Sequence, residues 1–287
     1  MAKDELMSRV KDNYELRYKE YLPRRTYAVL RLDGKAFHTY TRGCERPFDL
    51  GLMDDMDSTA KYLCENMQGA LFAYVQSDEI SILLTDFKKI KTSAWFDYEI
   101  QKISSISASM AAAKFNQLRL KRIIEADSDE NIGLKGNVLQ ALNDKLAAFD
   151  CRTFSVPDPV EVANVFIARQ NDATKNAISM AAQAEFSHKS LHGLSGNEKQ
   201  EKLFQEKGIN FNDYPAGFRR GRFIERVVYD KDGATRSKWD VVESPIFTQE
   251  QGFLYSKIPV VTPNGVCSLK ELGDATANLF LEPSINE

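Results

Sequence analysis

The chain has 287 residues, of which 43% are hydrophobic, and a formal net charge of −3 at pH 7. A chain of this length and composition can bury the core of one large domain or of two closely packed ones. Because the net charge is slightly negative, binding to nucleic acid must depend on local basic patches. The start of the chain is charged, and no apolar run approaches the roughly 18 residues of a membrane span. The sequence therefore predicts a cytoplasmic protein without membrane contact.

Zinc sites and the common nucleotide-binding loops are not indicated. The four cysteines show no CxxC spacing, and only three histidines are present to join them. We therefore expect reduced thiols. Neither GxxxxGK[ST] nor GxGxxG occurs, so P-loop and Rossmann chemistry have no support. His188 and His192 are four residues apart but lack the Glu of an HExxH arrangement, and we interpret them as a solvated helix end.

The first 157 residues alternate between helical and strand patterns. A charged amphipathic helix at 3–20 ends at Pro23, and the apolar stretch at 26–32 is typical of a central strand covered on both faces. Asp49 can cap a helix that runs to about residue 66. The remaining predicted elements are a β-hairpin with strands at 70–75 and 80–84, a helix rich in small residues at 94–118, a polar insertion at 119–149 and a strand at 151–156.

This β-α-β-β-α-β order is the ferredoxin-like arrangement, an antiparallel sheet with two helices on one face. We therefore predict an α+β fold and assign residues 1–157 to a first domain with a peripheral insertion at about 119–149. Residues 158–287 contain predicted helices at 158–188 and 197–207, then a basic, strand-rich extension with strands near 223–229 and 239–242. We expect this C-terminal part to pack on the first domain and to serve RNA contact and assembly.

Carboxylates lie at two strand ends that this topology brings together. The hairpin turn contains Asp78 and Glu79, and the first predicted strand ends at Asp33, followed by Gly34. Acidic residues are ordinary at turns. However, the first and third strands of a ferredoxin-like sheet are central neighbours, so Asp33 and Asp78 are expected to meet at one edge. Two carboxylates and the Gly34 carbonyl are the hard oxygen ligands that Mg²⁺ prefers.

A pair of Mg²⁺ ions at this edge suits phosphoryl or nucleotidyl transfer. Two ions about 4 Å apart activate an attacking oxygen and neutralise a leaving pyrophosphate. The stretch from Lys35 to His38 would run beneath a bound triphosphate and offer backbone N–H groups, and its position beside Asp33 favours a functional His38 over a packed one. Lys102 is most simply a surface lysine, and would contribute only if the first turns of its helix face the nucleotide.

Two polar clusters beyond residue 157 are candidates for RNA contact. One interrupts the apolar runs of the helix predicted at 158–188, and a structural hydrogen-bond network and a functional site are equally good interpretations. The other is a basic loop with aromatics, either a solvated loop or a contact to RNA phosphates. The candidate residues are Arg169, Gln170, Asp172 and Asn176 in the first cluster and Arg219, Arg220 and Arg222 in the second.

A collinear set of motifs resembles the tRNA(His) guanylyltransferase superfamily over about residues 3–250. The motifs are Arg31-Leu-Asp33-Gly34-Lys-Ala-Phe37-His38, Gln76-Ser77-Asp78-Glu79-Ile-Ser81, Trp95-Phe96, Phe149-Asp150-Cys-Arg152, Arg169-Gln170-x-Asp172 and Ile209-Asn-Phe-Asn212 through Arg220-Gly221. The resemblance implies a polymerase-palm domain and an enzyme that adds nucleotides to the 5′ end of tRNA in the 3′-to-5′ direction, with ATP, GTP and other nucleoside triphosphates as substrates.

The resemblance also implies residue roles. Asp33, the Gly34 carbonyl and Asp78 would bind two Mg²⁺ ions, with Glu79 in a supporting catalytic role. It further implies a homotetramer. The implied nucleotide-binding residues are Asp33, Gly34, Lys35, Ala36, Phe37, His38, Ser77 and Asp78, together with Lys102, which is retained near the start of the long helix.

One departure separates the chain from the eukaryotic enzymes. There, Arg-Gln-x-Asp continues with His-Ile-Asn-Asn-Leu-Tyr-Asn, whereas this chain has the segment from Ala173 to Met180, which retains Asn176 but no His or Tyr. A basic residue near the start of the long helix is also replaced, around Tyr98 and Glu99. The chain therefore resembles the guanylyltransferase-like proteins of bacteria, archaea and phages, which are implied to repair 5′-truncated tRNAs by template-directed addition. Addition of G to tRNA(His) is the other possibility.

Two other classes of protein share the same strand order. A diguanylate-type nucleotide cyclase has carboxylates at equivalent places, but its Gly-Gly hairpin signature is replaced here by Gln76-Ser77. A non-catalytic RNA-binding module reads bases with aromatic side chains on its central strands. The predicted third strand from Ile80 to Leu84 offers no aromatic residue, which disfavours that alternative.

Overall fold

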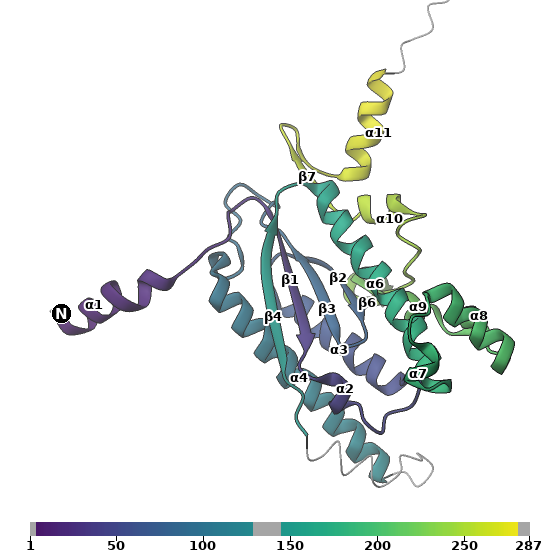
Figure 1. The fold of residues 1–287 in the computed structure, drawn as a ribbon. Helices are drawn as coiled ribbons and strands as arrows, with labels where there is room; N and C mark the ends of the chain where they lie inside the picture. Colours follow the sequence, from purple (N-terminus) through teal and green to yellow (C-terminus); the bar gives the residue numbers. More distant parts are fainter. Residues whose placement is uncertain (1–3, 129–144, 281–287) are drawn as a thin grey trace, which may run out of the picture.

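The computed structural model describes residues 4–128 and 145–280, and its centre is one antiparallel sheet. The strands lie in the order β4-β1-β3-β2-β5-β6 (Figure 1). The first four in chain order have the ferredoxin-like arrangement, which confirms the predicted fold class. The strands are β1 (Tyr27–Gly34), β2 (Ala70–Gln76), β3 (Glu79–Leu84), β4 (Phe149–Val156), β5 (Arg222–Lys231) and β6 (Ala234–Val242).

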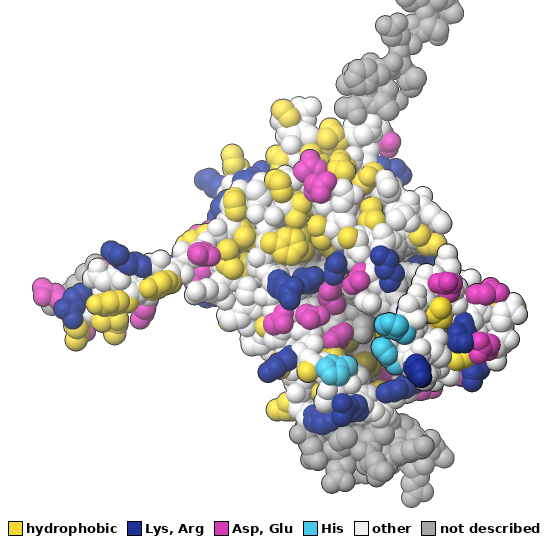
Figure 2. Space-filling view, in the orientation of Figure 1, with side chains coloured by type: hydrophobic (Ala, Val, Ile, Leu, Met, Phe, Trp, Pro, Cys, Tyr) yellow, Lys and Arg dark blue, Asp and Glu magenta, His cyan; other side chains and the backbone are white. Residues whose placement is uncertain are grey.

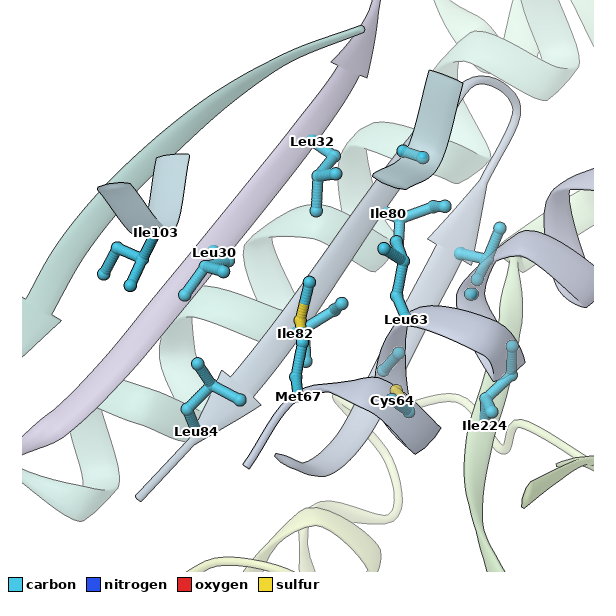
Figure 3. Packing of buried hydrophobic residues seen from close by; sticks show 14 of the residues in the cluster. Leu30, Leu32, Leu63, Cys64, Met67, Ile80, Ile82, Leu84, Ile103 and Ile224 are labelled. Atoms are coloured by element: carbon cyan, nitrogen blue, oxygen red, sulfur yellow. The ribbon is translucent and has the colours of Figure 1, made fainter. Parts of the chain in front are cut away.

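Helices α3 (Leu50–Asn66) and α4 (Ile100–Ser128) cover one face of the sheet. Successive residues of a strand point to opposite faces, so Leu30 and Leu32 of β1 point to this side with Ile80 and Ile82 of β3 (Figure 3). Ile103 of α4 packs in the same cluster and is fully buried. Asp49 caps α3 by accepting a hydrogen bond from the Leu52 N–H, as the sequence predicted.

The opposite face of the sheet is covered by α6 (Pro159–Glu185) and α10 (Gln251–Tyr255). Tyr27 and Val29 of β1 are buried here beside Phe166 of α6. Strand β1 is therefore covered on both faces, as its unbroken apolar pattern predicted. Helix α6 begins at the cap Asp158, whose side chain accepts from the Val160 and Glu161 N–H groups.

The C-terminal part continues the same sheet. Strand β5 pairs with β2 from Phe72↔Glu225 to Val75↔Arg222, so the boundary predicted at residue 157 is not a break in the sheet. The other elements of this part are α7 (His188–Leu191), α8 (Gly196–Lys207), η4 (Phe211–Asp213), α9 (Ala216–Arg220), β7 (Pro259–Thr262), β8 (Gly265–Ser268) and α11 (Leu269–Phe280).

The long helix differs from its prediction at both ends. Residues 95–98 form the short helix η3 (Trp95–Tyr98), in which Phe96 and Asp97 have positive φ, and α4 starts only at Ile100. At the other end α4 continues to Ser128, and Arg119 is 5% exposed with its Nη1 2.9 Å from Asp55 of α3. Residues 119–128 are therefore part of the helical layer and not of a peripheral insertion. The prediction for 129–144 lies outside the described residues.

The start of the chain forms an arm that extends away from the sheet (Figure 1). It consists of α1 (Glu5–Val10), the π-helical η1 (Lys11–Glu15) and η2 (Leu16–Tyr18). The short helix α2 (Phe37–Tyr40) follows shortly after the end of β1, at the edge of the sheet. None of the helices in the described ranges combines the length and the apolar composition that a membrane span needs.

Candidate active site

The end of β1 and the turn between β2 and β3 lie side by side, as the strand order requires. Asp33 is opposite Glu79 in the ladder, and the Gly34 N–H donates to the Asp78 carbonyl oxygen at 3.1 Å. The two predicted metal-binding carboxylates, 45 residues apart in sequence, are therefore adjacent. Ser77, which precedes Asp78, has a left-handed backbone (φ 45°) that completes the tight turn.

The Asp78 carboxyl group is in an environment that disfavours its charge. Burial raises the pKa of Asp78 to about 6, and the nearby negative charge of Asp33 contributes to the rise. A divalent cation would relieve both effects, because it neutralises two acidic groups together. This observation fits a cation held between Asp33 and Asp78.

The turn after Gly34 leaves no room for a side chain at that position. A Cβ on Gly34 would lie 2.3 Å from Cδ2 of Phe37, well inside van der Waals contact. Ala36 adopts the left-handed conformation (φ 53°), which starts α2 and directs the Phe37 ring toward Phe115 of α4. The Gly34 backbone therefore lies next to Asp78, with the Phe37 ring packed against the side where another residue would carry its Cβ.

A pocket of about 550 Å³ opens beside this turn. Most of the predicted nucleotide-binding residues line it, and its outer wall contains the rings of Phe48 and Phe218, stacked 4.8 Å apart. Helix α6 contributes the wall opposite the hairpin, including the exposed Asn176. The lining residues relevant to the predictions are Gly34, Ala36, Phe37, His38, Ser77, Asp78, Asn176 and Arg222.

Glu79 points away from the turn and is held in a buried polar network. It is 8% exposed, and its Oε2 lies 3.3 Å from Nη1 of Arg169 and 3.9 Å from Nε of Arg31. Gln76 and Ser81 donate to its Oε1. Glu79 therefore links the hairpin to α6. Its supporting role in catalysis stays a prediction.

Two arginines beside the carboxylates were not among the predicted site residues. Arg31 and Arg152 are opposite each other on β1 and β4, two residues before Asp33 and two after Asp150 in the same ladder. Alternation places all four side chains on one face. Arg152 is exposed and lies two positions along the ladder from the partner of Asp33. Arg31 and Arg152 belong to two of the sequence motifs that resemble the guanylyltransferase superfamily. Only the strand register shows that their side chains lie on the same face as Asp33.

The donor set matches Mg²⁺ better than a transition metal. Within residues 4–128 and 145–280, no group of three or more His, Cys, Asp or Glu side chains is arranged to hold a metal ion. The predicted ligands are two carboxylates, of Asp33 and Asp78, and the Gly34 backbone carbonyl, which are all oxygen atoms. Mg²⁺ is commonly bound in this way, with substrate phosphates and water as its remaining ligands.

Lys102 does not reach this site, which corrects its assignment to nucleotide binding. Its amine lies 4.9 Å from the centre of the Phe96 ring, at the start of α4. Phe37, in the pocket wall, packs against Phe115 of α4, which is thirteen residues after Lys102. An α-helix rises about 1.5 Å per residue. Lys102 is thus about 20 Å along the helix from the nucleotide pocket.

Two of the predicted RNA-contacting residues are structural. Gln170 is 3% exposed; it donates to the Pro245 carbonyl and accepts from the Phe247 N–H, so it anchors the segment after β6. Arg222 is 6% exposed, and its Nε donates to Asp57 at 2.8 Å. Neither residue can serve as a surface contact, which corrects both assignments, because their polar groups are committed inside the protein.

The other RNA candidates are partly or fully accessible. Arg219 donates to the Tyr214 carbonyl and Arg220 to the Ser244 carbonyl, which leaves each half-buried. Asn176 is exposed in the pocket wall, and Asp172, one turn earlier on α6, is half-buried with its Oδ2 3.8 Å from Nη1 of Arg169.

The His188 and His192 side chains are exposed at α7, with ring centres 6.3 Å apart. In Figure 2 the histidines gather near α2 and α7, on the face that also shows charged side chains over the sheet edge.

A palm-like sheet with paired carboxylates at a β-hairpin, beside a pocket of nucleotide size, defines the class of nucleotidyltransferases. The family described as "Thg1: tRNAHis guanylyltransferase" matches residues 7–157, which is more than half of the chain. The chain belongs to this family, and it is a nucleotidyltransferase that adds nucleotides to tRNA in the 3′-to-5′ direction. The cyclase and the non-catalytic RNA-binding module are not favoured by this result.

Relatives and solved structures agree with the family. The tRNA(His) guanylyltransferase of Saccharomyces cerevisiae is 28% identical over 70% of this chain and 82% of its own length. The tRNA(His) guanylyltransferase of Debaryomyces hansenii is 26% identical over 74% of this chain and 78% of its own length. A bacterial tRNA(His) guanylyltransferase-like protein in complex with ATP is 42% identical, with a TM-score of 0.75, and covers 86% of this chain and 96% of its own. The crystal structure of the Saccharomyces cerevisiae enzyme, 22% identical with a TM-score of 0.60, shows the shared fold.

Proposed function

We propose that this enzyme repairs the 5′ ends of truncated tRNAs by template-directed addition. The observation that supports the chemistry is the adjacency of Asp33 to Asp78, which lines the 550 Å³ pocket together with Gly34. The choice of repair over addition of one G to tRNA(His) is supported by identity. The chain is 42% identical to the bacterial guanylyltransferase-like protein but 26–28% identical to the yeast guanylyltransferases named above.

The residues at the sheet edge fit two Mg²⁺ ions as cofactors. Mg²⁺ held by Asp33, Asp78 and the Gly34 carbonyl would lower the pKa of the attacking 3′-hydroxyl and neutralise the leaving pyrophosphate. The Lys35 N–H donates to the Ala148 carbonyl oxygen at 2.8 Å, so the backbone from Ala36 to His38 is the part that would offer N–H groups to the triphosphate. The pocket beyond it, lined by Phe37 and His38, has the size to take a nucleoside and to limit its access to water. A bacterial guanylyltransferase-like structure contains ATP and another contains GTP, which supports both as substrates here.

We propose that the tRNA 5′ end approaches across α6 and β4. Arg152 is exposed beside Asp33, so it is suited to a phosphate of the incoming strand. Asn176 and Asp172 offer hydrogen bonds from α6, and Arg219 and Arg220 add positive charge from the last turn of α9, just before β5. Arg169 acts indirectly, because its guanidinium is bonded to Glu79.

The proposal is tested by a 5′-extension assay with single nucleotides. One substrate is a tRNA(His) transcript, and the other is a tRNA of another identity that lacks its first 5′ nucleotide. We expect addition of the nucleotide complementary to the opposing base on both substrates, and a changed nucleotide choice when that base is changed.

Addition of G alone to tRNA(His), regardless of the opposing base, would show the guanylyltransferase activity instead. Asp33→Asn is the control for the site: it is expected to abolish addition on both substrates while the thermal unfolding transition is retained. Activity at the parental level in this variant would overturn the metal assignment.

A further inference from the structure

The loop that follows β3, residues 85–93, exposes three lysines close together. Lys88, Lys89 and Lys91 are all exposed, and Ile90 between them is 90% exposed. Asp86 is the only acid in this segment, and it is fully buried. Figure 2 shows Lys and Arg side chains gathered on this side of the body, next to the segment that connects the arm to β1. The exposed part of the loop is therefore purely basic, in a chain whose formal net charge is −3.

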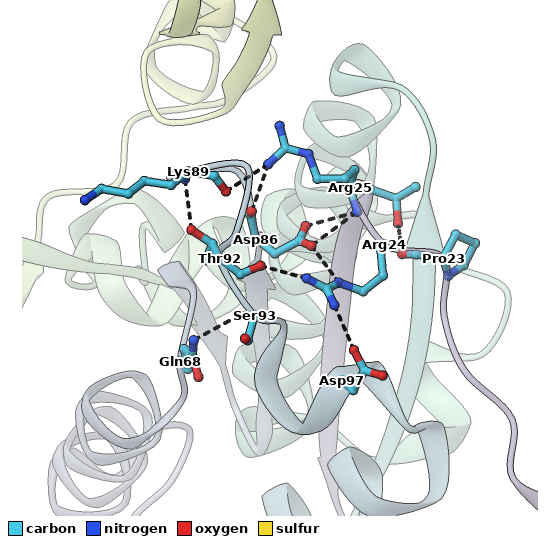
Figure 4. A network of polar contacts seen from close by, with 10 residues as sticks. Pro23, Arg24, Arg25, Gln68, Asp86, Lys89, Thr92, Ser93 and Asp97 are labelled. Carbon is cyan, nitrogen blue, oxygen red and sulfur yellow. Dashed lines mark hydrogen bonds and ion pairs between the residues drawn. The ribbon is translucent and has the colours of Figure 1, made fainter.

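The buried Asp86 holds this loop in one shape. Its Oδ2 accepts a hydrogen bond from Nε of Arg24 at 2.8 Å, and its Oδ1 accepts from the Arg25 N–H at 3.1 Å (Figure 4). Arg24 also donates to the Thr92 carbonyl at 2.7 Å. The Lys89 N–H donates to Oγ1 of Thr92, while the Lys89 side chain extends away from the network (Figure 4). The loop backbone is therefore already ordered, which lowers the entropy cost of binding a ligand.

The loop lies at the end of the sheet opposite to the catalytic carboxylates. Phe87 packs against Tyr27, the first residue of β1, with ring centres 5.0 Å apart. Asp33 is six residues further along β1, which is about 20 Å at 3.3 Å per residue. This distance is less than one turn of a nucleic-acid duplex, which is about 35 Å in DNA. A duplex that has its end at Asp33 is therefore long enough to reach the loop.

An uncovered strip of the sheet joins the two ends. Arg152 and Phe154 of the edge strand β4 are exposed and lie on the face that α6 covers over β1. Arg152 is near the Asp33 end of this strip, and Phe154 lies opposite Val29, two residues from Tyr27. A substrate that lies along β4 would therefore pass Arg152 first and then reach the lysines of the loop.

The phosphates of an RNA backbone are the partner that these features fit. Lysines bind phosphates as point charges, which adds affinity and orientation without reading sequence. The enzyme acts on tRNA, so a duplex bound by its 5′ end is already on the molecule, and a second contact to it needs no further association step. An anionic lipid surface would attract the same charges. The uncovered strip that leads from the catalytic carboxylates to the loop favours RNA.

We propose that Lys88, Lys89 and Lys91 bind backbone phosphates of the tRNA acceptor stem, about 20 Å from the 5′ end that is extended. The stem lies along β4, with Arg152 near its end and the three lysines farther along. The loop holds the stem in one orientation whatever its sequence. This proposal rests on the approach of tRNA across α6 and β4 proposed above, but it does not depend on whether addition follows a template.

Removal of the three lysines tests the contact. The variant K88A/K89A/K91A is expected to bind a 5′-truncated tRNA about tenfold more weakly, with kcat and the KM for the nucleotide unchanged. The slope of log affinity against log salt concentration should become shallower by about two to three, because each lost phosphate contact removes about one. The matched control K11A/K121A/K231A removes three other exposed lysines and is expected to leave both quantities unchanged.

Directed cleavage of the RNA locates the contact. An iron–EDTA probe is attached to the new thiol of Ile90→Cys, at the most exposed position of the loop. It is expected to cut the tRNA backbone in the acceptor stem, several base pairs from the 5′ end. The parent, treated with the same reagent, gives the background from its own four cysteines.

The proposal is overturned if K88A/K89A/K91A binds tRNA as tightly as the parent, or if cleavage from position 90 is absent or falls outside the acceptor stem. Loss of binding to phosphatidylserine vesicles with unchanged tRNA affinity would identify a lipid surface instead. The repair proposal fails separately, because it is tested by the choice of nucleotide, whereas the loop is tested by tRNA affinity.

Discussion

Asp78 shows how one residue is specialised at the expense of stability. Its carboxyl group is desolvated and next to Asp33, so the charged form that binds a cation is disfavoured in the metal-free protein. Functional sites commonly combine burial with like charge in this way. The sequence alone indicated that Asp78 and Asp33 would be neighbours, but the cost of placing them together is visible only in the structure.

Replacing Asp78 by Asn is therefore expected to stabilise the metal-free enzyme. The folded protein holds this proton more tightly than the unfolded chain, so the cost is absent in acid and fully present above the raised pKa. A rise in pKa from 3.8 to about 6 corresponds to at most about 3 kcal/mol at neutral pH, and partial exposure reduces it. We expect a melting temperature about 2–5 °C higher in EDTA, measured by differential scanning calorimetry.

Added Mg²⁺ should raise the melting temperature of the parent and leave Asp78→Asn unaffected. Glu65→Gln, at an exposed acid on α3 away from this edge of the sheet, is the control expected to change neither value. A lower melting temperature for Asp78→Asn in EDTA would contradict the argument.

Gly34 is a second residue whose identity is set by its surroundings. In Gly34→Ala the new Cβ would meet the Phe37 ring at 2.3 Å, so the ring or the turn must shift. We expect a loss of about 1–3 kcal/mol in the free energy of unfolding, by urea titration, and at least a tenfold loss of 5′ addition.

The double variant G34A/F37L should recover part of the stability, since a smaller side chain relieves the contact. Gly252→Ala, which meets no atom within 4 Å, is the control expected to be neutral. Equal stability of Gly34→Ala and the parent would show that the turn is not restricted.

At the scale of elements, α6 is the part whose role changed most between sequence and structure. The polar block in its middle was open to a structural or a functional interpretation. The structure divides it: Arg169 and Gln170 are bonded inside the protein, whereas Asn176 is exposed in the pocket wall. One helix is thus bonded to the β2–β3 hairpin and also lines the 550 Å³ pocket.

Removing the link between α6 and the hairpin is expected to affect both stability and catalysis. In Arg169→Met, Glu79 remains buried with the Arg31 guanidinium 3.9 Å away as its nearest remaining cation. We expect a loss of about 1–3 kcal/mol in urea unfolding and a lower kcat for 5′ addition with little change in KM for the nucleotide. Lys175→Met, at an exposed position of the same helix, is the control.

Glu79→Gln in the Arg169→Met background should restore part of the stability, because no unpaired charge is then buried. A purely additive loss in the double variant would show that the two residues do not interact.

At the scale of the whole molecule, the first 157 residues and the described C-terminal part share one sheet and one hydrophobic core. Strand β5 extends the sheet, and α6 covers the face formed by Tyr27, Val29 and Phe166. Residues 158–287 are therefore not an appended module, because their described part supplies half of the second core. This explains how the motifs of residues 31–79 and 169–222 converge on one pocket.

A chain that ends at residue 157 is accordingly expected not to fold. It would expose the β2 edge and the apolar face beneath α6, both of which favour aggregation. We expect no cooperative thermal transition for this fragment by circular dichroism, whereas the full chain unfolds in one transition. A fragment with a sharp transition of its own would show that the predicted boundary separates independent domains.

Most of the fold could be predicted because its patterns are local. Runs of apolar residues mark the central strands, Asp49 and Asp158 mark helix starts, and the order of strands restricts the sheet to few topologies. The limits of the long helix were missed at both ends, because they depend on contacts with distant segments. The Tyr98 carbonyl accepts a hydrogen bond from the N–H of Leu22, in the segment before β1. Arg119 forms an ion pair with Asp55 of α3.

The sequence by itself determined the chemistry, since Asp33, Gly34 and Asp78 lie at strand ends that the β-α-β-β-α-β order must bring together. Only the tertiary structure decided which other residues take part. Lys102 is excluded by its distance along α4, Gln170 and Arg222 by burial, and Arg152 is included by register. The reason is physical: backbone pattern specifies which segments become neighbours, but exposure and charge partners depend on every side chain packed around a residue.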